Sequence, residues 1–128
     1  MKKKALLIPY NSKGEIFIQD RRGHKPPPWG FFGGGIEVGE TSLKAVIRET
    51  KEELDLDIAE KDIDYMGEFP TKFNDVETER SLYLYSTEQI EFTVLEGAGG
   101  RWVTFAEAKE LLHAGDTIDL IKAAIKRS

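Results

Sequence analysis

The 128-residue sequence predicts a single domain of the α/β class. Three observations predict this class. Short apolar stretches with strand-like alternation cluster in the first and middle thirds of the chain, one amphipathic helix follows a run of three glycines, and two further helical stretches end the sequence. A chain of this length buries about two-thirds of its unfolded surface, which is enough for one core.

The strand candidates come first in the chain and return in its middle. They are Ala5–Tyr10, Glu15–Gln19, Asp64–Phe69, Ser81–Ser86, Ile90–Leu95 and Arg101–Thr104. The first two flank the turn sequence NSKG, so we expect them to form a hairpin. The stretch RRGHKPPPWG that follows should be a stiff loop, because three consecutive prolines remove backbone donors and fix φ.

The first helix is expected from about Thr41 to Leu54, with Thr41 or Ser42 as its N-cap. Its apolar positions fall in one sector of a helical wheel and should form the core face. They are Leu43, Val46, Ile47, Thr50 and Leu54. Two shorter helices are expected at Phe105–His113 and Thr117–Lys126.

Composition argues against several classes of function. A net charge of −5 does not favour bulk nucleic-acid binding, so an anionic partner would need a local basic patch or a bridging cation. The sequence has no cysteine, which excludes disulfides, thiolate zinc sites and cysteine nucleophiles and is typical of a cytoplasmic protein. No segment approaches the length of a membrane span. The start MKKKALLIPY has too short an apolar run for a signal peptide.

Three glutamates of the first predicted helix share one face. Glu49 is three residues from Glu52 and four from Glu53, so like charges converge, at about 0.2–0.5 kcal/mol for each exposed pair. The bases lie to one side, and the glycine run Gly33–Gly35 precedes the helix at an entropic cost. A solvated acidic face is the simpler interpretation. Carboxylates with a glycine carbonyl, without histidine or cysteine, instead suit Mg²⁺ or Mn²⁺.

The segment from Gly34 to Leu56 resembles the Nudix box, G-x5-E-x7-R-E-U-x-E-E-x-G-U, where U is a bulky aliphatic residue. The matching positions are Gly34, Glu40, Arg48, Glu49, Glu52, Glu53 and Leu56. Thr50 replaces an aliphatic residue but still fits the core face. Asp55 replaces a glycine, and we expect it to adopt a left-handed turn at some cost in stability. The first hairpin, WGFFGGG and RWVTFAEAKELL also resemble the family, so the likeness extends over most of the chain.

The resemblance implies the Nudix fold, a mixed β-sheet sandwiched between α-helices, with the box at 34–56 forming a loop–helix–loop. It also implies hydrolysis of a nucleoside diphosphate linked to another group, with Mg²⁺ or Mn²⁺ as cofactor. The implied metal ligands are the Gly34 carbonyl, Glu49, Glu52 and Glu53. Glu52, Glu53 and Arg48 are the implied catalytic residues of the box, and Arg48 and Glu40 would orient the cluster.

Residues outside the box are candidates for an additional acid and for substrate binding. By the same resemblance, Glu96 in LEGAGGRW would bind metal or accept the proton of the attacking water, with Glu77 and Glu79 in the polar loop before Ser81 as alternatives. The substrate-binding candidates are Arg21 for a phosphate, Gly35, and Asp116 for a nucleobase edge. An ordinary surface role is the alternative for Glu96, Arg21 and Asp116.

The function hypothesis is a nucleotide pyrophosphohydrolase. A small domain without insertions fits a (d)NTP pyrophosphatase that releases a nucleoside monophosphate. ADP-ribose or NDP-sugar hydrolysis and dinucleoside polyphosphate hydrolysis remain alternatives. A non-catalytic Nudix-like nucleotide sensor is a different class, disfavoured because the box keeps all its glutamates, and a structural Ca²⁺ site lacks the EF-hand spacing. The expected partner is a small-molecule nucleotide, with no membrane, and the protein should be a monomer or homodimer.

Overall fold

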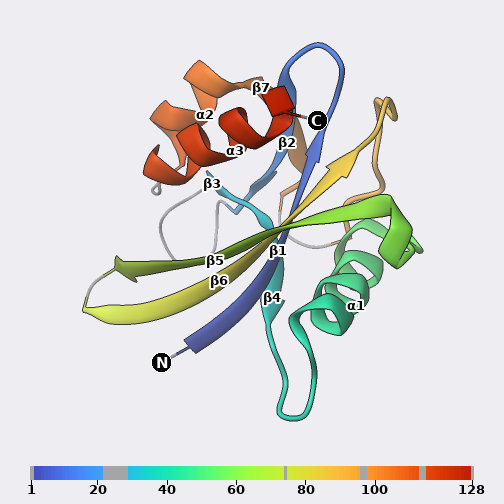
Figure 1. Cartoon of the computed structure of the whole chain (residues 1–128). Helices are drawn as coiled ribbons and strands as arrows, with labels where there is room; N and C mark the ends of the chain where they lie inside the picture. Colours follow the sequence, from blue (N-terminus) through green and yellow to red (C-terminus); the bar gives the residue numbers. More distant parts are fainter. Residues whose placement is uncertain (1, 22–28, 74, 96–97, 113–114, 128) are drawn as a thin grey trace.

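One mixed β-sheet lies between two helical layers in the computed structural model of this chain (Figure 1). The structure describes residues 2–21, 29–73, 75–95, 98–112 and 115–127. Helix α1 (Ser42–Leu54) covers one face of the sheet, and helices α2 (Phe105–Leu111) and α3 (Gly115–Arg127) cover the other. This is the layered arrangement predicted from the sequence. None of the helices in the described ranges has the length and apolar character needed to cross a bilayer.

The sheet contains strands from both halves of the chain. They are β1 (Lys2–Tyr10), β2 (Glu15–Asp20), β3 (Trp29–Gly30), β4 (Phe32–Gly35), β5 (Ile63–Phe73), β6 (Val76–Ser86) and β7 (Gly100–Thr104), with a 3₁₀ turn, η1 (Glu60–Asp62), before β5. The strand order is β3-β2-β1-β6-β5, with β4 paired to β1 and β7 paired to β2. Strands β1 and β6 are parallel and the other pairs are antiparallel, so the sheet is mixed.

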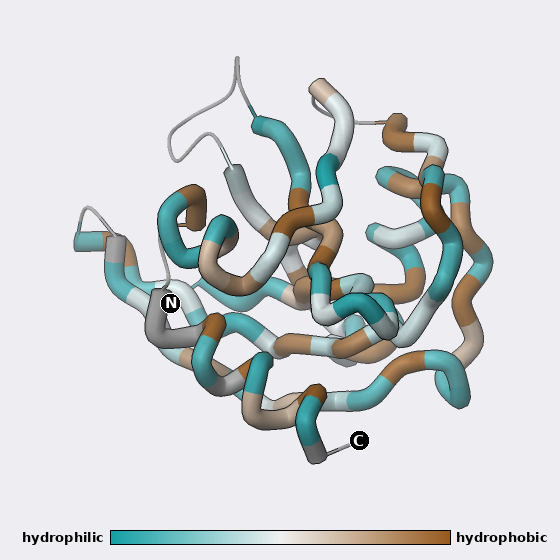
Figure 2. The backbone as a smooth tube through the Cα atoms, turned by 90° about the horizontal axis from the view of Figure 1, so that it is seen from above, coloured by the Kyte–Doolittle hydropathy of each residue, from teal (hydrophilic) through white to brown (hydrophobic). Residues whose placement is uncertain are grey.

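Strand β1 is buried on both faces, which explains the unbroken apolar run at positions 5–8. Leu6 and Ile8 belong to the buried cluster that contains Ile121 of α3. Leu7 points to the opposite face and belongs to the cluster that contains Val46 of α1. In Figure 2, hydrophobic and hydrophilic bands alternate along the backbone tube, as expected for elements that each bury one face.

Helix α1 begins and ends as the sequence predicts. The Thr41 hydroxyl accepts a hydrogen bond from the Lys44 backbone N–H at 3.1 Å, which caps the first turn. Asp55 ends the helix in the left-handed conformation, with φ 52° and ψ 37°. Thr50 is buried on the core face, where its hydroxyl donates to the Val46 carbonyl at 2.7 Å. That bond satisfies a polar group that the usual aliphatic residue would not carry.

The strand predicted at Ile90–Leu95 is wrong, because residues 87–95 have no regular secondary structure. Phe92 and Val94 pack against the α1-side core. Their alternation therefore reflects one-sided packing of an irregular segment. The Ile90 carbonyl accepts a hydrogen bond from the Trp102 indole N–H at 2.9 Å. A side chain therefore satisfies this backbone carbonyl, which in a sheet would pair with the N–H of a neighbouring strand.

Three segments expected to be irregular are strands instead. The glycines Gly33–Gly35 belong to β4, which pairs with β1. Trp29 and Gly30, at the end of the predicted stiff loop, form β3 against β2. Glu77 and Glu79 lie within β6 and not in a loop. Each of these segments gains its backbone partners from a strand elsewhere in the chain, and local sequence patterns do not report such pairing.

Replacing Asp55 with glycine should stabilise the domain. The left-handed conformation costs a residue with a side chain up to about 1–2 kcal/mol, somewhat less for Asp, and glycine adopts it freely. We expect Asp55→Gly to raise Tm by about 2–4 °C. Asp55→Asn is the matched control, because it removes the ion pair with Lys51 (3.0 Å) and keeps the side chain. If Asp55→Gly is no more stable than Asp55→Asn, backbone strain at this position is not a cost to the fold.

Candidate active site

The glycine strand β4 runs directly against helix α1, and its backbone approaches two of the predicted acidic residues. A Cβ at Gly33 would collide with the Ala5 carbonyl, and its φ of 133° already requires glycine. A Cβ at Gly34 would lie 2.6 Å from Oε1 of Glu49. The Gly33 N–H donates to Oε1 of Glu53 at 2.8 Å. The absence of a Cβ at these two positions allows this approach.

The three glutamates of α1 have different environments. Glu53 is buried, with 2% of its surface exposed, and its carboxylate accepts the Gly33 hydrogen bond. Glu49 is partly buried beside Gly34, with a side-chain exposure of 14%. Glu52 is the exposed member, at 56%. The helical periodicity of the sequence predicts that all three share one face of α1. It does not show that the Glu53 carboxylate also holds β4 through the Gly33 amide.

Arg48 connects the acids of the box to the glycine strand. Its Nε and Nη2 each donate to one oxygen of Glu40, both at 2.9 Å, which forms a bidentate pair. Nη2 also donates to the Gly35 carbonyl at 3.1 Å, and Nη1 donates to Glu49 at 3.0 Å. The more distant Glu52 lies 3.4 Å from Nη1. Arg48 therefore fixes the loop between β4 and α1 in relation to the acidic face.

Two hydrogen bonds from Arg48 and one from the backbone N–H of Glu37 lower the pKa of Glu40 to about 2. The same pairing with Glu40 is the main cause that raises the pKa of Arg48 above its ordinary value. Glu40 is thus an anion, and Arg48 a cation, throughout the physiological range. The predicted role of Glu40 in orienting the metal-binding cluster stays a prediction.

The donor set of this region fits a hard divalent cation. Glu49 and Glu52 offer carboxylate oxygens beside backbone carbonyls of β4, which are the ligands that Mg²⁺ and Mn²⁺ prefer. Within the described ranges, however, no three acidic or histidine side chains are already placed to hold one ion. Arg48 provides the positive charge next to Glu49 and Glu52. A metal bound here would therefore take over carboxylate contacts that Arg48 now makes.

The sequence matches the family model described as NUDIX domain over residues 2–123. The chain belongs to the Nudix family. This membership and the sandwiched mixed sheet confirm the family and the fold that the resemblance implied. The acidic face of α1 and the glycine strand beside it are the structural form of the Nudix box.

Two curated relatives and one solved structure illustrate the similarity. The NAD-capped RNA hydrolase NudC of Haemophilus influenzae (strain PittGG) is 27% identical over an alignment that covers 95% of this chain and 50% of NudC. An uncharacterised Nudix hydrolase of Listeria innocua is 31% identical, covering 85% of this chain and 67% of that protein. A structure of MutT, from work on Aliivibrio salmonicida and Vibrio cholerae, is 26% identical with a TM-score of 0.74, and covers 96% of this chain and 98% of that one. This chain spans about half the length of NudC.

The structure places some candidates from outside the Nudix box and leaves others undescribed. Arg21 follows β2 and packs over Gly30, where a Cβ would lie 3.0 Å from its Cδ. Glu79 faces Glu68 of β5, and the hydrogen bond and charge of Glu79 raise the pKa of Glu68. Glu96 lies outside the described residues. Asp116 belongs to the first turn of α3, but its side chain also lies outside the described part. Their predicted roles stay predictions.

The pairing of Glu40 with Arg48 should appear as acid sensitivity of the fold. The pKa of Glu40 is lowered from 4.5 to about 2 in the folded state. Its pairing with Arg48 therefore stabilises the fold fully at any pH above the unfolded pKa of 4.5, and this contribution is lost as the pH falls from 4.5 towards 2. Without divalent cations, Tm of the wild type should fall more steeply across this window than Tm of Glu40→Gln. The control is Glu37→Gln, since Glu37 is exposed and lies 3.9 Å from Arg48. It should follow the wild-type curve, and parallel curves for Glu40→Gln and wild type would exclude this contribution.

Proposed function

We propose that this Nudix domain hydrolyses a pyrophosphate bond in a nucleoside diphosphate derivative, with Mg²⁺ or Mn²⁺ as cofactor. The observation that carries the proposal is the packing of Glu49 and Glu53 against a strand of glycines, with Arg48 fixing the junction. An arrangement that costs both backbone entropy and charge repulsion is expected at a functional site. Membership of the Nudix family supports the reaction class.

The residues that would hold the ion are Glu49, Glu52, Glu53 and the Gly34 carbonyl. A divalent ion bound there would neutralise charge that develops on the phosphate oxygens and acidify a bound water. In the reaction, water adds to a phosphorus atom, the bridging P–O bond breaks, and the bridging oxygen leaves with the other phosphate.

The chain itself supplies a rigid frame and a proton acceptor. The Gly33–Glu53 hydrogen bond and the contacts of Arg48 with Glu40 and Gly35 hold the acidic face in place before substrate binds. The proton of the attacking water passes to a carboxylate. The proposed acceptors are Glu52, which is the exposed box glutamate, and Glu96.

For the substrate we propose a nucleoside or deoxynucleoside triphosphate, cleaved to the monophosphate and pyrophosphate. The size of the domain without insertions supports this choice. One observation favours a second candidate: NudC, which matches 95% of this chain, is named as a hydrolase of NAD-capped RNA, so a dinucleotide pyrophosphate is the alternative. A screen of nucleoside triphosphates, ADP-ribose, NDP-sugars, dinucleoside polyphosphates and NADH, scored for mononucleotide release, separates these substrates. Nucleotides that raise Tm without any release of product would instead indicate a sensor domain.

Hydrolysis should depend on the divalent ion and on Glu52. We expect activity to disappear in EDTA and to return with Mg²⁺ or Mn²⁺, because the acidic face repels an anionic substrate without a cation. Glu52→Gln should lower kcat by roughly 10²–10⁴, the range for a lost acid–base group. Glu110→Gln, an exposed glutamate in α2, is the charge-matched control and should keep wild-type kcat. Undiminished turnover in EDTA would refute the proposed mechanism.

Gly34→Ala tests whether the glycine strand exists to accommodate Glu49. The three atoms nearest to the added Cβ all belong to the flexible end of the Glu49 side chain, so the carboxylate should move while the fold survives. We expect Tm without metal to change by only about 1–2 °C, and the rise in Tm on adding Mg²⁺ to be lost. Glu49→Gln should also lose this response.

The double variant Gly34→Ala/Glu49→Gln tests whether the alanine acts by displacing Glu49 or whether the two substitutions lower activity independently. If the alanine acts by displacing Glu49, the double variant should lose no more activity than Glu49→Gln alone. Additive losses would mean that Gly34 acts through something other than Glu49.

A further inference from the structure

A row of three residues crosses the sheet beside the Nudix box. Lys4 of β1 pairs with Gly35 of β4 on one side and with Arg80 of β6 on the other. Residues directly opposite each other in a sheet project from the same face. The cationic side chains of Lys4 and Arg80 are therefore neighbours, and both are one or two strand spacings, about 5–10 Å, from the backbone of Gly35.

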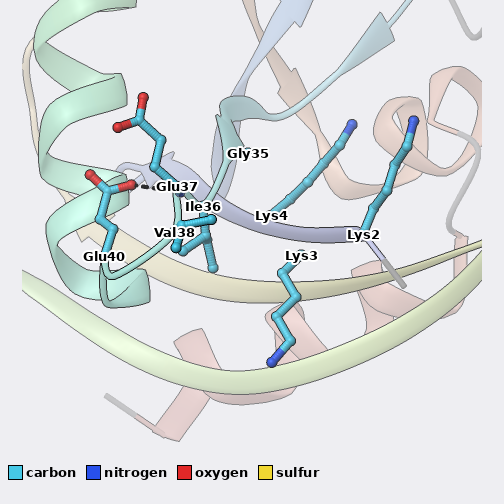
Figure 3. Close-up of a pocket in the computed structure, with 8 residues that line it drawn as sticks. All are labelled: Lys2, Lys3, Lys4, Gly35, Ile36, Glu37, Val38 and Glu40. Atoms are coloured by element: carbon cyan, nitrogen blue, oxygen red, sulfur yellow. Dashed lines mark hydrogen bonds between the residues drawn. The ribbon is translucent and has the colours of Figure 1, made fainter.

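Because side chains alternate along β1, Lys2 lies on the same face as Lys4, and Lys3 does not. Lys2 and Lys4 extend in the same direction, whereas Lys3 points to the opposite side (Figure 3). Burial, followed by the charges of Arg21, Lys2 and Arg80, lowers the pKa of Lys4. Within the described ranges neither Lys2 nor Lys4 forms an ion pair with an acid. Positive charge therefore accumulates here in a protein whose net charge is −5.

The lysines of β1 and the loop of the Nudix box line one groove. An open groove of about 520 Å³ is lined by residues 2–4 of β1 and by residues 35–38 and 40 of the loop that leads to α1. Figure 3 shows the Glu37 and Glu40 side chains at one side of this groove and the Lys2 and Lys4 side chains at the other, with Gly35 between them. The Gly35 carbonyl accepts a hydrogen bond from Arg48, so the groove adjoins the arginine that contacts the acidic face.

We propose that Lys2 and Lys4, with Arg80 beside Lys4 in the sheet, form a subsite for a phosphate group of the substrate that lies outside the scissile pyrophosphate link. The assignment rests on the proposed function for the identity of the substrate, and it narrows the substrate class to nucleotides with an additional phosphate. The substrate would span Gly35, with its scissile link at the acidic face and its extra phosphate at the cationic row. Lysine and arginine are the side chains that bind phosphate most strongly.

The clustering of positive charges around Lys4 favours binding of an anionic ligand over a purely structural role for these side chains. Lysines near the free end of a strand are commonly solvated, and Lys2 by itself would need no explanation. Lys4, however, is half-buried next to other cations, and burying one positive charge beside others is unfavourable. A bound phosphate would offset the repulsion between Lys4 and its cationic neighbours, because it attracts each of them.

The test measures anion binding without catalysis. Inorganic tripolyphosphate is titrated calorimetrically into the protein in buffer stripped of divalent ions, so that the acidic face cannot contribute to binding. We expect wild type to bind, and Lys4→Gln to weaken the affinity by at least about fivefold because a charge-assisted contact is lost. Lys2→Gln should weaken it by about two- to fivefold, since Lys2 is exposed.

The matched control is Lys13→Gln, which removes the same charge from the exposed turn between β1 and β2, outside the residues that line the groove. Its affinity should stay within about twofold of wild type. No binding by wild type, or equal losses in Lys13→Gln and Lys4→Gln, would overturn the subsite. Melting curves of each variant show whether Lys4→Gln has kept its fold, and Lys2→Gln provides the test if it has not.

A second measurement separates failure of the subsite from failure of the proposed function. With Mg²⁺ and the nucleotide preferred in the screen, Lys4→Gln should raise KM by about fivefold or more and leave kcat within about twofold. Hydrolysis with an unchanged KM in Lys4→Gln would refute the subsite and leave the hydrolase intact. Tripolyphosphate binding that depends on Lys4, in a protein that hydrolyses no nucleotide, would support the subsite and refute the hydrolase.

Discussion

The close packing of strand β4 against helix α1 is the constraint on which the rest of the site depends. Two glutamates of one helix pack against the backbone of two glycines, because Gly33 donates to Glu53 and Gly34, which has no Cβ, leaves room for Glu49. Strand β4 in turn is held by its pairing with β1 at the centre of the sheet. The acidic face is therefore fixed by the core of the protein and not by a surface loop, which gives it the rigidity that metal and substrate positioning require.

Charge is distributed unevenly about this junction. Arg48 contacts Glu40, Glu49 and Glu52 on the side of α1 and offsets part of their negative charge, and its bidentate pair with Glu40 keeps both partners charged. Across Gly35, the groove is lined by lysines of β1. An anionic substrate would meet cations on one side and, once a divalent ion is bound, a neutralised acidic face on the other. Such separation of charge favours one orientation of a ligand along the groove.

Local sequence signals predicted those parts of the structure that depend on neighbouring residues. The first hairpin, the Thr41 cap and the left-handed Asp55 follow from turn and capping chemistry within a few residues. Long-range pairing was not visible. The glycines of β4 looked like a loop, Glu77 and Glu79 were expected in a loop and lie in β6, and the alternating segment Ile90–Leu95 looked like a strand. In each case a distant strand or a packed side chain decided the outcome.

The sequence by itself determined the family, through the fixed spacing of the Nudix box, and the side of α1 that carries the acids, because helical periodicity is a local property. Only the tertiary structure decided how those acids differ. Burial beside β4 commits Glu53 to the Gly33 amide and leaves Glu52 exposed, although the two are adjacent in the chain. Strand register likewise brought Lys4 next to Arg80, which is 76 residues away in sequence. Register depends on the pairing of whole strands, so no short stretch of sequence contains it.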